Sequence, residues 1–298
     1  MRHSRDGAFR GPSQLTSSAG AIQLDSFDAA RLKNARGIVR GLGSVLVAYS
    51  GGVDSTFLLK LAMDELGDGA VAVLASSPAY PDSEQVAARE LAASMGVRLV
   101  EVRTSEVELE GYARNHPDRC FHCKEELFDT LAPVQQELGL RHLAYGATAD
   151  DAGDHRPGHA SAVRRGVRFP LLEAGMAKAE IRAAARALGL PNWNKPSFAC
   201  LSSRIPHGTP VTVAALRQIE AAESAIKALG FAQVRVRHHG DVARIEVDAA
   251  EIPRLISQRE RVAAAVRQAG YKFASADLEG YSTGSLNRVW KRTSSQSS

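Results

Sequence analysis

Short apolar runs alternate with helical patterns through the first half of the chain, and this alternation restricts the fold more than any other feature. Four runs have the length and composition of strands buried in a parallel sheet: 44–49, 70–75, 98–102 and 142–145. Three helical patterns lie between them, at 55–66, 83–95 and 124–138. Strands and helices in alternation form a parallel sheet that helices cover on both faces. We therefore expect an α/β fold with a doubly wound parallel sheet.

The pattern changes after about residue 196. A loop rich in Pro, Ser and Gly occupies 195–210, and a strong helical pattern follows at 213–229. The rest predicts two alternating strands, a helix and a last strand, at 233–237, 242–247, 250–269 and 272–276. This order predicts a smaller C-terminal α+β unit, with a boundary at about 198–210.

The division of the chain follows from these two patterns. We expect a large domain over 25–200 and a smaller one over 201–290, which contributes to the substrate site or to oligomerisation. The ends of the chain, 1–24 and 291–298, are polar and lack a periodic apolar pattern. Such segments cannot bury enough apolar surface to fold, so we expect both to be disordered tails.

Charge and cysteine content narrow the class of protein. The net charge of +4 is a mild excess that suits an anionic small substrate or RNA without requiring either. No run approaches the roughly 18 apolar residues of a membrane helix, and the N-terminus lacks a signal-peptide core. In a reduced compartment a Cys-x-x-Cys pair is more often a metal or redox site than a disulfide. We expect a cytoplasmic protein with no membrane partner.

The loop Ser50-Gly51-Gly52-Val53-Asp54-Ser55 lies where a predicted strand ends and a helix begins. Ligands of α/β proteins bind at the carboxyl ends of parallel strands. Gly51 and Gly52 allow a sharp turn close to phosphate oxygens, and Ser50 and Ser55 add hydroxyl donors beside the helix N-terminus. Asp54 fits among these anion binders if it holds Mg²⁺ or caps the turn. A glycine turn that binds nothing is the alternative.

The three cysteines form a second pattern. Cys120 and Cys123 are about one helical turn apart, and Cys200 lies far along the chain. Three thiolates can hold an iron–sulfur cluster in which one iron stays open to another ligand. A zinc site with His122, a redox disulfide or three unrelated thiols would also fit this spacing.

The phosphate loop resembles the PP-loop of the ATP pyrophosphatases, which cleave ATP between the α- and β-phosphates. The resemblance implies AMP transfer to a carboxylate or carbonyl, with release of pyrophosphate. Tight binding of pyrophosphate stabilises the charge that develops on the leaving group. The end of the second strand lies beside the adenine in this fold, which suggests a base contact from Ser76, although a plain loop also fits. The implied ATP site contains Ala48, Ser50, Gly51, Gly52, Asp54, Ser55, Ser76, Lys124 and Gly146.

Further motifs extend the resemblance over about residues 28–288. They are Asp118-Arg119-Cys120-Phe121-His122-Cys123-Lys124, Asp150-Asp151-Ala152-Gly153-Asp154-His155-Arg156-Pro157-Gly158, Asn192-Trp193-Asn194-Lys195-Pro196-Ser197, Cys200 with Ser203-Arg204, and Val234-Arg235-Val236-Arg237 with Ala243-Arg244-Ile245-Glu246. The set is similar to the LarE family, ATP-dependent sulfur transferases that help to make the nickel-pincer nucleotide cofactor of lactate racemase. The resemblance implies adenylation of a carboxylate of pyridinium-3,5-biscarboxylate mononucleotide and its conversion to a thiocarboxylate.

The family also suggests two roles for the cysteines. Some members donate the sulfur of one cysteine, at the position of Cys200, and are left with dehydroalanine. Others carry three cysteines and hold a [4Fe-4S] cluster whose open iron delivers sulfide. This chain has all three, so the resemblance implies a cluster on Cys120, Cys123 and Cys200, repeated turnover and an external sulfide source. Glu223 matches a family carboxylate near the sulfur site, although its position also fits an ordinary helix surface.

Charged residues complete the implied site. Lys124 matches a pyrophosphate contact, and a solvated lysine is the alternative. Asp150 and Asp154 suit Mg²⁺ held between phosphates, and a loop salt bridge is the alternative.

Two arginines of a predicted strand form the last charged group of the implied site. Arg235 and Arg237 alternate along that strand and therefore share a face, where Arg204 would complete an anion clamp. The resemblance implies that Arg235 and Arg237 hold the phosphate of the substrate mononucleotide. A solvated basic strand is the alternative.

Three other functions remain open on the sequence. A PP-loop tRNA thiolase would share nearly all of this chemistry but needs a basic, aromatic RNA surface, and only 6% of residues are aromatic. An amidating PP-loop ligase would need ammonia delivery rather than three soft ligands. A non-catalytic nucleotide or iron–sulfur carrier is the third. We expect a small-molecule nucleotide substrate, no nucleic acid partner and a homo-oligomer.

Overall fold

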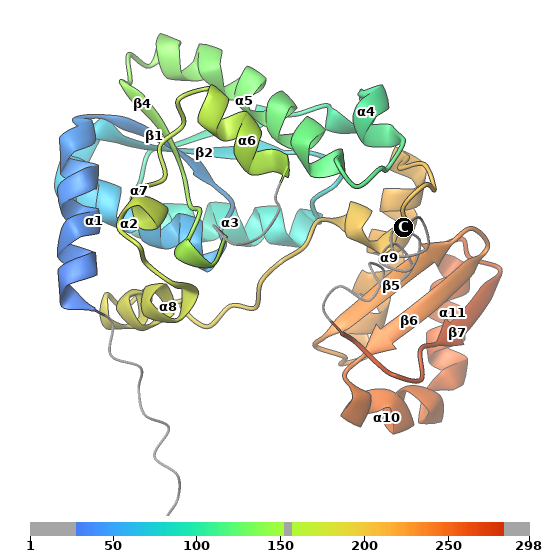
Figure 1. Cartoon of the computed structure of the whole chain (residues 1–298). Coiled ribbons are helices and arrows are strands. Elements are labelled where there is room, and N and C mark those ends of the chain that lie inside the picture. Colours follow the sequence, from blue (N-terminus) through green and yellow to red (C-terminus); the bar gives the residue numbers. More distant parts are fainter. Residues whose placement is uncertain (1–27, 152–156, 283–298) are drawn as a thin grey trace, which may run out of the picture.

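The structure, a computed structural model, describes residues 28–151 and 157–282. Four parallel strands form the larger sheet, in the order β3-β2-β1-β4 (Figure 1). They are β1 (Val45–Tyr49), β2 (Ala70–Ser76), β3 (Leu99–Arg103) and β4 (His142–Tyr145). Val45 of β1 lies opposite Ala70 of β2 and His142 of β4. The parallel sheet and its intervening helices confirm the predicted α/β class.

Helices cover both faces of this sheet (Figure 1). The longer ones are α1 (Ala29–Leu42), α2 (Val53–Leu66), α3 (Asp82–Met95), α5 (Arg119–Glu137), α6 (Pro157–Arg164) and α8 (Lys178–Ala187). Alternate residues of a strand point to opposite faces. Accordingly, Val45 and Val47 share an apolar cluster with residues of α1, α2, α3 and α8, whereas Leu46 shares one with residues of α5 and α6. The buried core therefore holds the carboxyl ends of the strands in fixed positions.

Short helical turns complete this part of the chain. They are α4 (Glu110–Ala113), α7 (Pro170–Glu173) and the 3₁₀ helices Gly67–Gly69, Glu106–Glu108, Ala149–Asp151 and Leu201–Arg204. No helix among the described residues combines the length and the apolar composition needed to cross a membrane.

A second, smaller sheet forms from the C-terminal part of the chain. It contains β5 (Val234–His239), β6 (Val242–Val247) and β7 (Phe273–Ala276), with β5 antiparallel and β7 parallel to β6. Helices α9 (Val213–Ala228), α10 (Ile252–Ser257) and α11 (Arg259–Gln268) pack with it, and a further 3₁₀ helix spans Ala249–Glu251. Val234, Val236 and Ile245 belong to the apolar core that this sheet shares with the helices. Arg235 and Arg237 therefore occupy the opposite face of β5.

An apolar cluster joins the two parts. Ala79, Val107 and Tyr112 of the first part pack with Leu201 and Leu216 of the second. The half-buried Cys123 and Cys200 pack against the same cluster. The boundary at 198–210 stays a prediction, and the expected tails at 1–24 and 291–298 lie outside the described residues.

The observed helices differ from the predicted ones at two places. Helix α5 begins at Arg119 rather than at about 124, so the Cys-x-x-Cys pair lies on the helix. The single helix predicted at 250–269 is wrong, because α10 and α11 are separated at Gln258. The Ser257 hydroxyl donates to the carbonyl of Arg254 at 2.8 Å, and such bonds compete with the continuation of a helix.

Of the longer helices, α1, α6 and α8 were not predicted from the sequence, and neither were the short helices α4 and α7. Helix α1 has a clear start signal in Asp28, whose Oδ1 accepts a hydrogen bond from the backbone N–H of Ala30 at 2.8 Å. Helix α8 begins where Glu180 accepts from the N–H of Ala177 at 2.9 Å.

Candidate functional site

The loop from Ser50 to Ser55 connects the end of β1 to the first turn of α2. Gly51 has φ +68°, a left-handed conformation that favours glycine. The Ser55 hydroxyl donates to the carbonyl of Gly52 at 3.1 Å and lies 3.2 Å from the N–H of Ser50, which donates to it. No side chain of the described residues caps α2 at its N-terminus. A helix N-terminus without a side-chain cap can give its first N–H groups to an anion.

Replacing Gly51 tests whether the shape of this loop matters. A Cβ at this position would lie 2.7 Å from the Cβ of Ala88 on α3, and the left-handed φ would strain any side chain. We expect Gly51→Ala to lower the free energy of unfolding by about 1–3 kcal/mol and to weaken ATP binding. Thermal unfolding and titration calorimetry measure the two effects.

Gly37→Ala is the matched control. Gly37 lies inside α1, where an added Cβ meets no atom of the described residues within 4 Å. The substitution should raise stability by about 0.5–1 kcal/mol and leave ATP binding unchanged. Unchanged ATP binding in Gly51→Ala would contradict the role given to the loop.

One cavity of about 300 Å³ opens beside the loop. Residues from the ends of β1, β2 and β4, from α5 and from the segment 195–198 line it. The lining contains seven residues of the predicted ATP site: Ala48, Ser50, Gly52, Asp54, Ser55, Lys124 and Gly146. Cys123 lines the same cavity. A nucleotide on the loop would therefore share one space with a thiol.

The other predicted ATP residues have different positions. Gly51 shapes the loop without lining the cavity, and Ser76 does not line it either. The Ser76 hydroxyl instead donates to the carbonyl of Val102 at 3.1 Å, so it ties β2 to β3. Gly146 lets β4 approach the loop, since a Cβ there would lie 3.0 Å from the backbone nitrogen of Ser55.

Acidic and basic groups meet at the phosphate end of the cavity. Burial raises the pKa of the Asp54 carboxyl, the nearby charge of Lys178 lowers it, and Asp151 raises it further. Asp151 lines the cavity, although the sequence pointed to Asp150 and Asp154 instead. Carboxylates that line a cavity beside a phosphate-binding loop suit Mg²⁺.

The aspartates proposed for Mg²⁺ were Asp150 and Asp154. Asp150 is exposed, and its Oδ2 accepts a hydrogen bond from the N–H of Lys178 at 2.6 Å, at the start of α8. Asp154 lies outside the described residues. Asp150 is near enough to raise the pKa of Asp54 but does not line the cavity.

The three cysteines lie on two segments. Cys120 is exposed on the first turn of α5, while Cys123 and Cys200 are half-buried. Burial raises the pKa of the Cys123 thiol to about 12. Among residues 28–151 and 157–282, no three His, Cys, Asp or Glu side chains are grouped closely enough to hold a metal ion. The three thiols supply the donor chemistry of an iron–sulfur cluster, but the structure does not bring them together into one metal-binding group.

Arg119 of α5 and Tyr112 of α4 both bond the segment that carries Cys200. The Arg119 guanidinium, at the start of α5, donates to the carbonyl of Ser202 at 2.9 Å. The hydroxyls of Tyr112 and Ser202 lie 2.6 Å apart. Arg119 and Ser202 are both buried, and Ser202 lies two residues after Cys200. The position of Cys200 relative to α5 is therefore set by contacts that use no sulfur atom.

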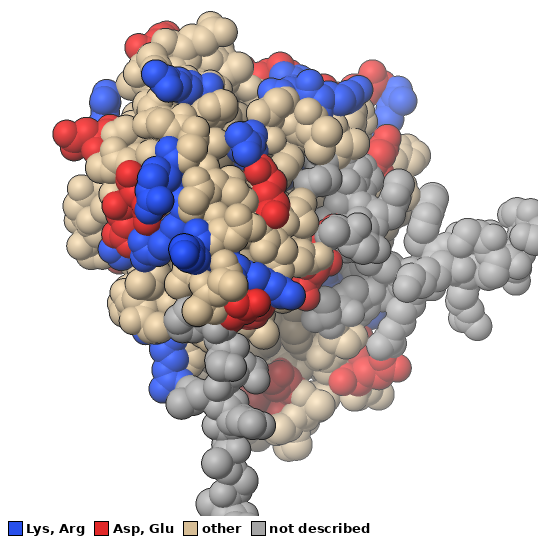
Figure 2. All heavy atoms as spheres, turned by 60° about the vertical axis from the view of Figure 1, so that its left-hand side comes forward, with Lys and Arg blue, Asp and Glu red and all other residues tan. Residues whose placement is uncertain are grey.

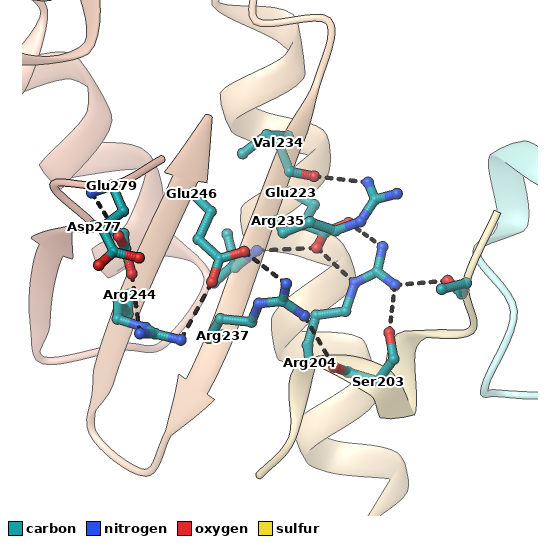
Figure 3. A network of polar contacts seen from close by, with 12 residues as sticks. Ser203, Arg204, Glu223, Val234, Arg235, Arg237, Arg244, Glu246, Asp277 and Glu279 are labelled. Carbon is teal, nitrogen blue, oxygen red and sulfur yellow. Dashed lines mark hydrogen bonds and ion pairs between the residues drawn. The ribbon is translucent and has the colours of Figure 1, made fainter. Parts of the chain in front are cut away.

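Arg204 belongs to a buried polar network beside the smaller sheet (Figure 3). Its guanidinium donates to both oxygens of Glu223, at 2.9 and 3.1 Å. It also donates to the carbonyls of Ala199 and Cys200, at 2.6 and 3.0 Å. Glu223 is 3% exposed and accepts from the N–H of Val236 at 3.0 Å, so it is not a helix-surface residue.

Arg237 extends the network along the sheet. It donates to Glu246 at 2.6 Å and to the carbonyl of Ser203 at 3.0 Å (Figure 3). Arg244 bonds Glu246 at 3.2 Å and Asp277 at 3.0 Å. Both arginines of β5 are buried, and Arg237 is ion-paired, so the solvated basic strand considered from the sequence is ruled out.

Arg235 differs from these two arginines. It is 8% exposed, and no carboxylate among the described residues forms an ion pair with it. Its Nη1 donates to the carbonyl of Val234 at 2.9 Å, and the Tyr281 ring lies 5.4 Å away. Burial lowers the pKa of Arg235, and the nearby charge of Arg204 lowers it further. Of the three arginines, Arg235 has the greatest need for an added anion.

Sequence reasoning missed several residues of the cavity. Asp151, Lys178, Arg182, Lys195 and Glu106 all line it. Glu106 is 1% exposed; its Oε1 accepts from the Ser77 hydroxyl, and its Oε2 has no hydrogen-bond partner among the described residues. The signal for Glu106 was its place just after the third strand. Lys178 and Arg182 belong to α8, a helix that the sequence pattern did not reveal.

An uncapped helix N-terminus, a left-handed glycine and a polar cavity at the ends of parallel strands define a nucleotide-binding α/β protein. Relatives narrow this class. The chain is 36% identical over 250 residues to pyridinium-3,5-bisthiocarboxylic acid mononucleotide synthase of Lactiplantibacillus plantarum, covering 84% of this chain and 91% of the relative. The chain belongs to the family of this synthase, the LarE family.

The chain is also similar to two other proteins. An uncharacterized Synechocystis protein is 40% identical over 87% of this chain and 97% of its own length. A glutamine-hydrolyzing GMP synthase chain of Sulfurisphaera tokodaii is 27% identical over 52% of this chain and 46% of its own length. No protein-family model matches the chain.

Proposed function

We propose that this chain is an ATP-dependent sulfur transferase of the PP-loop type. It adenylates a carboxylate of pyridinium-3,5-biscarboxylate mononucleotide and converts it to a thiocarboxylate, a step in making a nickel-pincer nucleotide cofactor. The observation that carries the proposal is the shared cavity, because the phosphate loop and Cys123 line the same space. Similarity to the Lactiplantibacillus synthase supports the product.

The charges of the cavity support a divalent cation with ATP. Of the described residues that line it, four are acidic and four are basic: Asp54, Glu84, Glu106 and Asp151 against Lys124, Lys178, Arg182 and Lys195. The lining therefore offers no net positive charge to a polyanion. Mg²⁺ commonly binds through one or two carboxylates together with substrate phosphates. We infer that Asp54 and Asp151 hold it, and that Mg²⁺ supplies charge neutralisation at the phosphates.

The protein's own groups account for the adenylation chemistry. The N–H groups of the loop and of the first turn of α2 hold the departing pyrophosphate, and Lys124, which lines the same cavity, adds a positive charge. Donors placed where charge develops stabilise the transition state without having to reorganise. The loop N–H groups and Lys124 would share the negative charge of the leaving group, and Mg²⁺, if held by Asp54 and Asp151, would supply further charge neutralisation.

Arg235 supports the anionic substrate. Its buried cation lacks an ion pair among the described residues, and a phosphate would supply the missing charge. Arg204 already donates hydrogen bonds to Glu223 and to the carbonyl of Cys200. We therefore propose that it positions Cys200 and does not bind the substrate phosphate. Arg237 holds the carbonyl of Ser203 and can add to the same anion site.

The face of the molecule drawn in Figure 2 gives no support to RNA binding. Basic and acidic side chains are intermingled on the face shown in Figure 2. Ion pairs join α1 to α2: Arg36 pairs with Asp64 and Glu65, and Arg40 pairs with Glu65. Among the described residues on this face, there is no continuous basic surface of the kind that a tRNA thiolase needs.

Product analysis tests the proposal. The full chain is incubated with ATP, Mg²⁺, sulfide and the biscarboxylate mononucleotide, and pyrophosphate and the thiocarboxylate are quantified by mass spectrometry. We expect one pyrophosphate for each carboxylate converted. Pyrophosphate release with an amide product, with ammonia as the nucleophile, would instead favour the amidating ligase that the GMP synthase similarity suggests.

The source of sulfur needs its own experiment. The three-cysteine type of the family predicts a [4Fe-4S] cluster on Cys120, Cys123 and Cys200, and no step above depends on it. Protein purified and reconstituted without oxygen should contain roughly four irons per chain and keep its intact mass after turnover. Reconstituted protein that binds no iron and loses one sulfur per turnover would contradict the cluster and identify Cys200 as the donor. The cytoplasmic location, the homo-oligomer and the external sulfide source stay predictions.

A further inference from the structure

The segment that leads to Cys200 touches the phosphate loop. The Asn192 side chain donates to the carbonyl of Gly51 at 3.1 Å and to the hydroxyl of Thr56 at 3.0 Å. The Nζ of Lys195 lies 3.5 Å from the same Gly51 carbonyl. Lys195 is thus at the phosphate end of the cavity, and it belongs to a motif whose role was not assigned.

Lys195 has a second partner. Its Nζ forms an ion pair with Glu84 of α3 at 2.7 Å. Both side chains are about a quarter exposed, at 24% and 27%, and both line the cavity. An ion pair with this exposure is only modestly favourable, so a stronger anion can replace the carboxylate. The phosphates of a nucleotide on the loop would be such an anion, since they carry several charges within reach of Lys195.

We propose that Lys195 binds the terminal phosphates of ATP. When ATP binds, the Lys195 ammonium gives up its ion pair with Glu84 and pairs with these phosphates instead. This inference rests on the proposed function, because it assumes that the loop holds ATP. Glu84 keeps the ammonium group beside the loop before the nucleotide arrives. The exchange transfers the ammonium from one carboxylate to the group that leaves as pyrophosphate.

The exchange also orders the chain that follows. Pro196, Ser197 and Phe198 line the cavity directly after Lys195. A phosphate bound by Lys195 fixes the start of this stretch, whose other end is Cys200. Arrival of ATP therefore holds the cysteine-bearing segment over the nucleotide.

Binding measurements on the full chain test the assignment. Titration calorimetry with ATP and with AMP, each with Mg²⁺, compares the wild type with Lys195→Ala. We expect ATP to bind about ten- to a hundredfold more weakly and AMP to bind within about twofold of the wild type. Lys195→Arg should recover most of the ATP affinity because it restores the charge. Lys60→Ala is the control, since Lys60 carries the same charge on α2 but pairs with Asp64 and does not line the cavity.

Glu84→Gln should change the affinity for ATP in the direction opposite to Lys195→Ala. It removes the competing carboxylate, so ATP should bind about two- to fivefold more tightly. This gain should disappear when Lys195 is already alanine. Equal weakening of ATP and AMP in Lys195→Ala, unchanged ATP binding, or weaker ATP binding in Glu84→Gln would each overturn the exchange.

These measurements use no carboxylated substrate, which separates the two proposals. If the binding pattern holds while the wild type releases no pyrophosphate with the mononucleotide, only the proposed function fails. If pyrophosphate is released normally but the binding pattern is absent, only the role of Lys195 fails.

Discussion

Asp54→Asn should abolish adenylation without weakening the fold. The substitution keeps the shape of the side chain and removes the negative charge of the carboxylate, which we propose as a ligand of Mg²⁺ at the phosphate loop. We expect the rate of pyrophosphate release to fall by about a hundred- to a thousandfold, the range for loss of one group that stabilises a transition state electrostatically. Single-turnover assays at saturating ATP and Mg²⁺ measure this rate.

Although Asp54→Asn should lower activity, it should keep or raise the stability of the folded protein. Burial raises the pKa of Asp54 above its unfolded value, so ionisation of this carboxyl disfavours the folded state above that unfolded value. A neutral Asn removes this penalty, and the melting temperature at neutral pH should be equal to or higher than that of the wild type. Such a trade between activity and stability is typical of charges held for function.

Asp64→Asn is the control for Asp54. Asp64 lies on the same helix and pairs with Arg36 and Lys60 at the surface, and it does not line the cavity. It should release pyrophosphate at the wild-type rate. Near-normal release from Asp54→Asn would contradict our assignment of the loop.

Glu223→Ala should give the largest loss of stability. Arg204 is fully buried and Glu223 is its bidentate partner, so the substitution leaves a buried guanidinium without its counter-charge. Removing one partner of a buried ion pair lowers the free energy of unfolding by about 3–5 kcal/mol. Denaturant unfolding followed by circular dichroism measures the change.

A second variant separates charge from packing. Replacing the pair by apolar residues, as in Arg204→Met with Glu223→Leu, should recover most of the lost stability because neither position then buries an unpaired charge. That double variant should still transfer sulfur poorly, since the carbonyl of Cys200 has lost its donor.

The exposed pair between Lys272 and Asp241 provides the comparison, and Asp241→Ala should change stability by less than about 1 kcal/mol. A similarly small effect of Glu223→Ala would show that the network contributes little to the fold.

Local patterns predicted most of the fold. The strands of both sheets were expected within a residue or two of β1 to β7, since each depends on a short apolar or alternating run. The phosphate loop was equally visible, because its serines, glycines and aspartate are consecutive. Helix α1 was missed although Asp28 marks its start, and the break at Gln258 was missed because it depends on a side chain that bonds a backbone carbonyl.

Contacts between side chains that are far apart in the sequence could not be predicted from local patterns. Arg204 was expected to bind phosphate, yet Glu223 occupies it, and that pairing follows from the packing of α9 against β5. Cross-strand register explains a second case. Arg237 lies opposite Arg244, and Glu246 bonds both, which no local pattern could reveal.

The fastening of α5 to Ser202 has a consequence for how such a site can evolve. Arg119 and Tyr112 hold the Cys200 segment through oxygen and nitrogen atoms alone. Substituting Cys120 and Cys123 would leave these contacts in place, and Cys200 would keep its position. A lineage could therefore gain or lose the cysteines at positions 120 and 123 without rebuilding the core that positions Cys200.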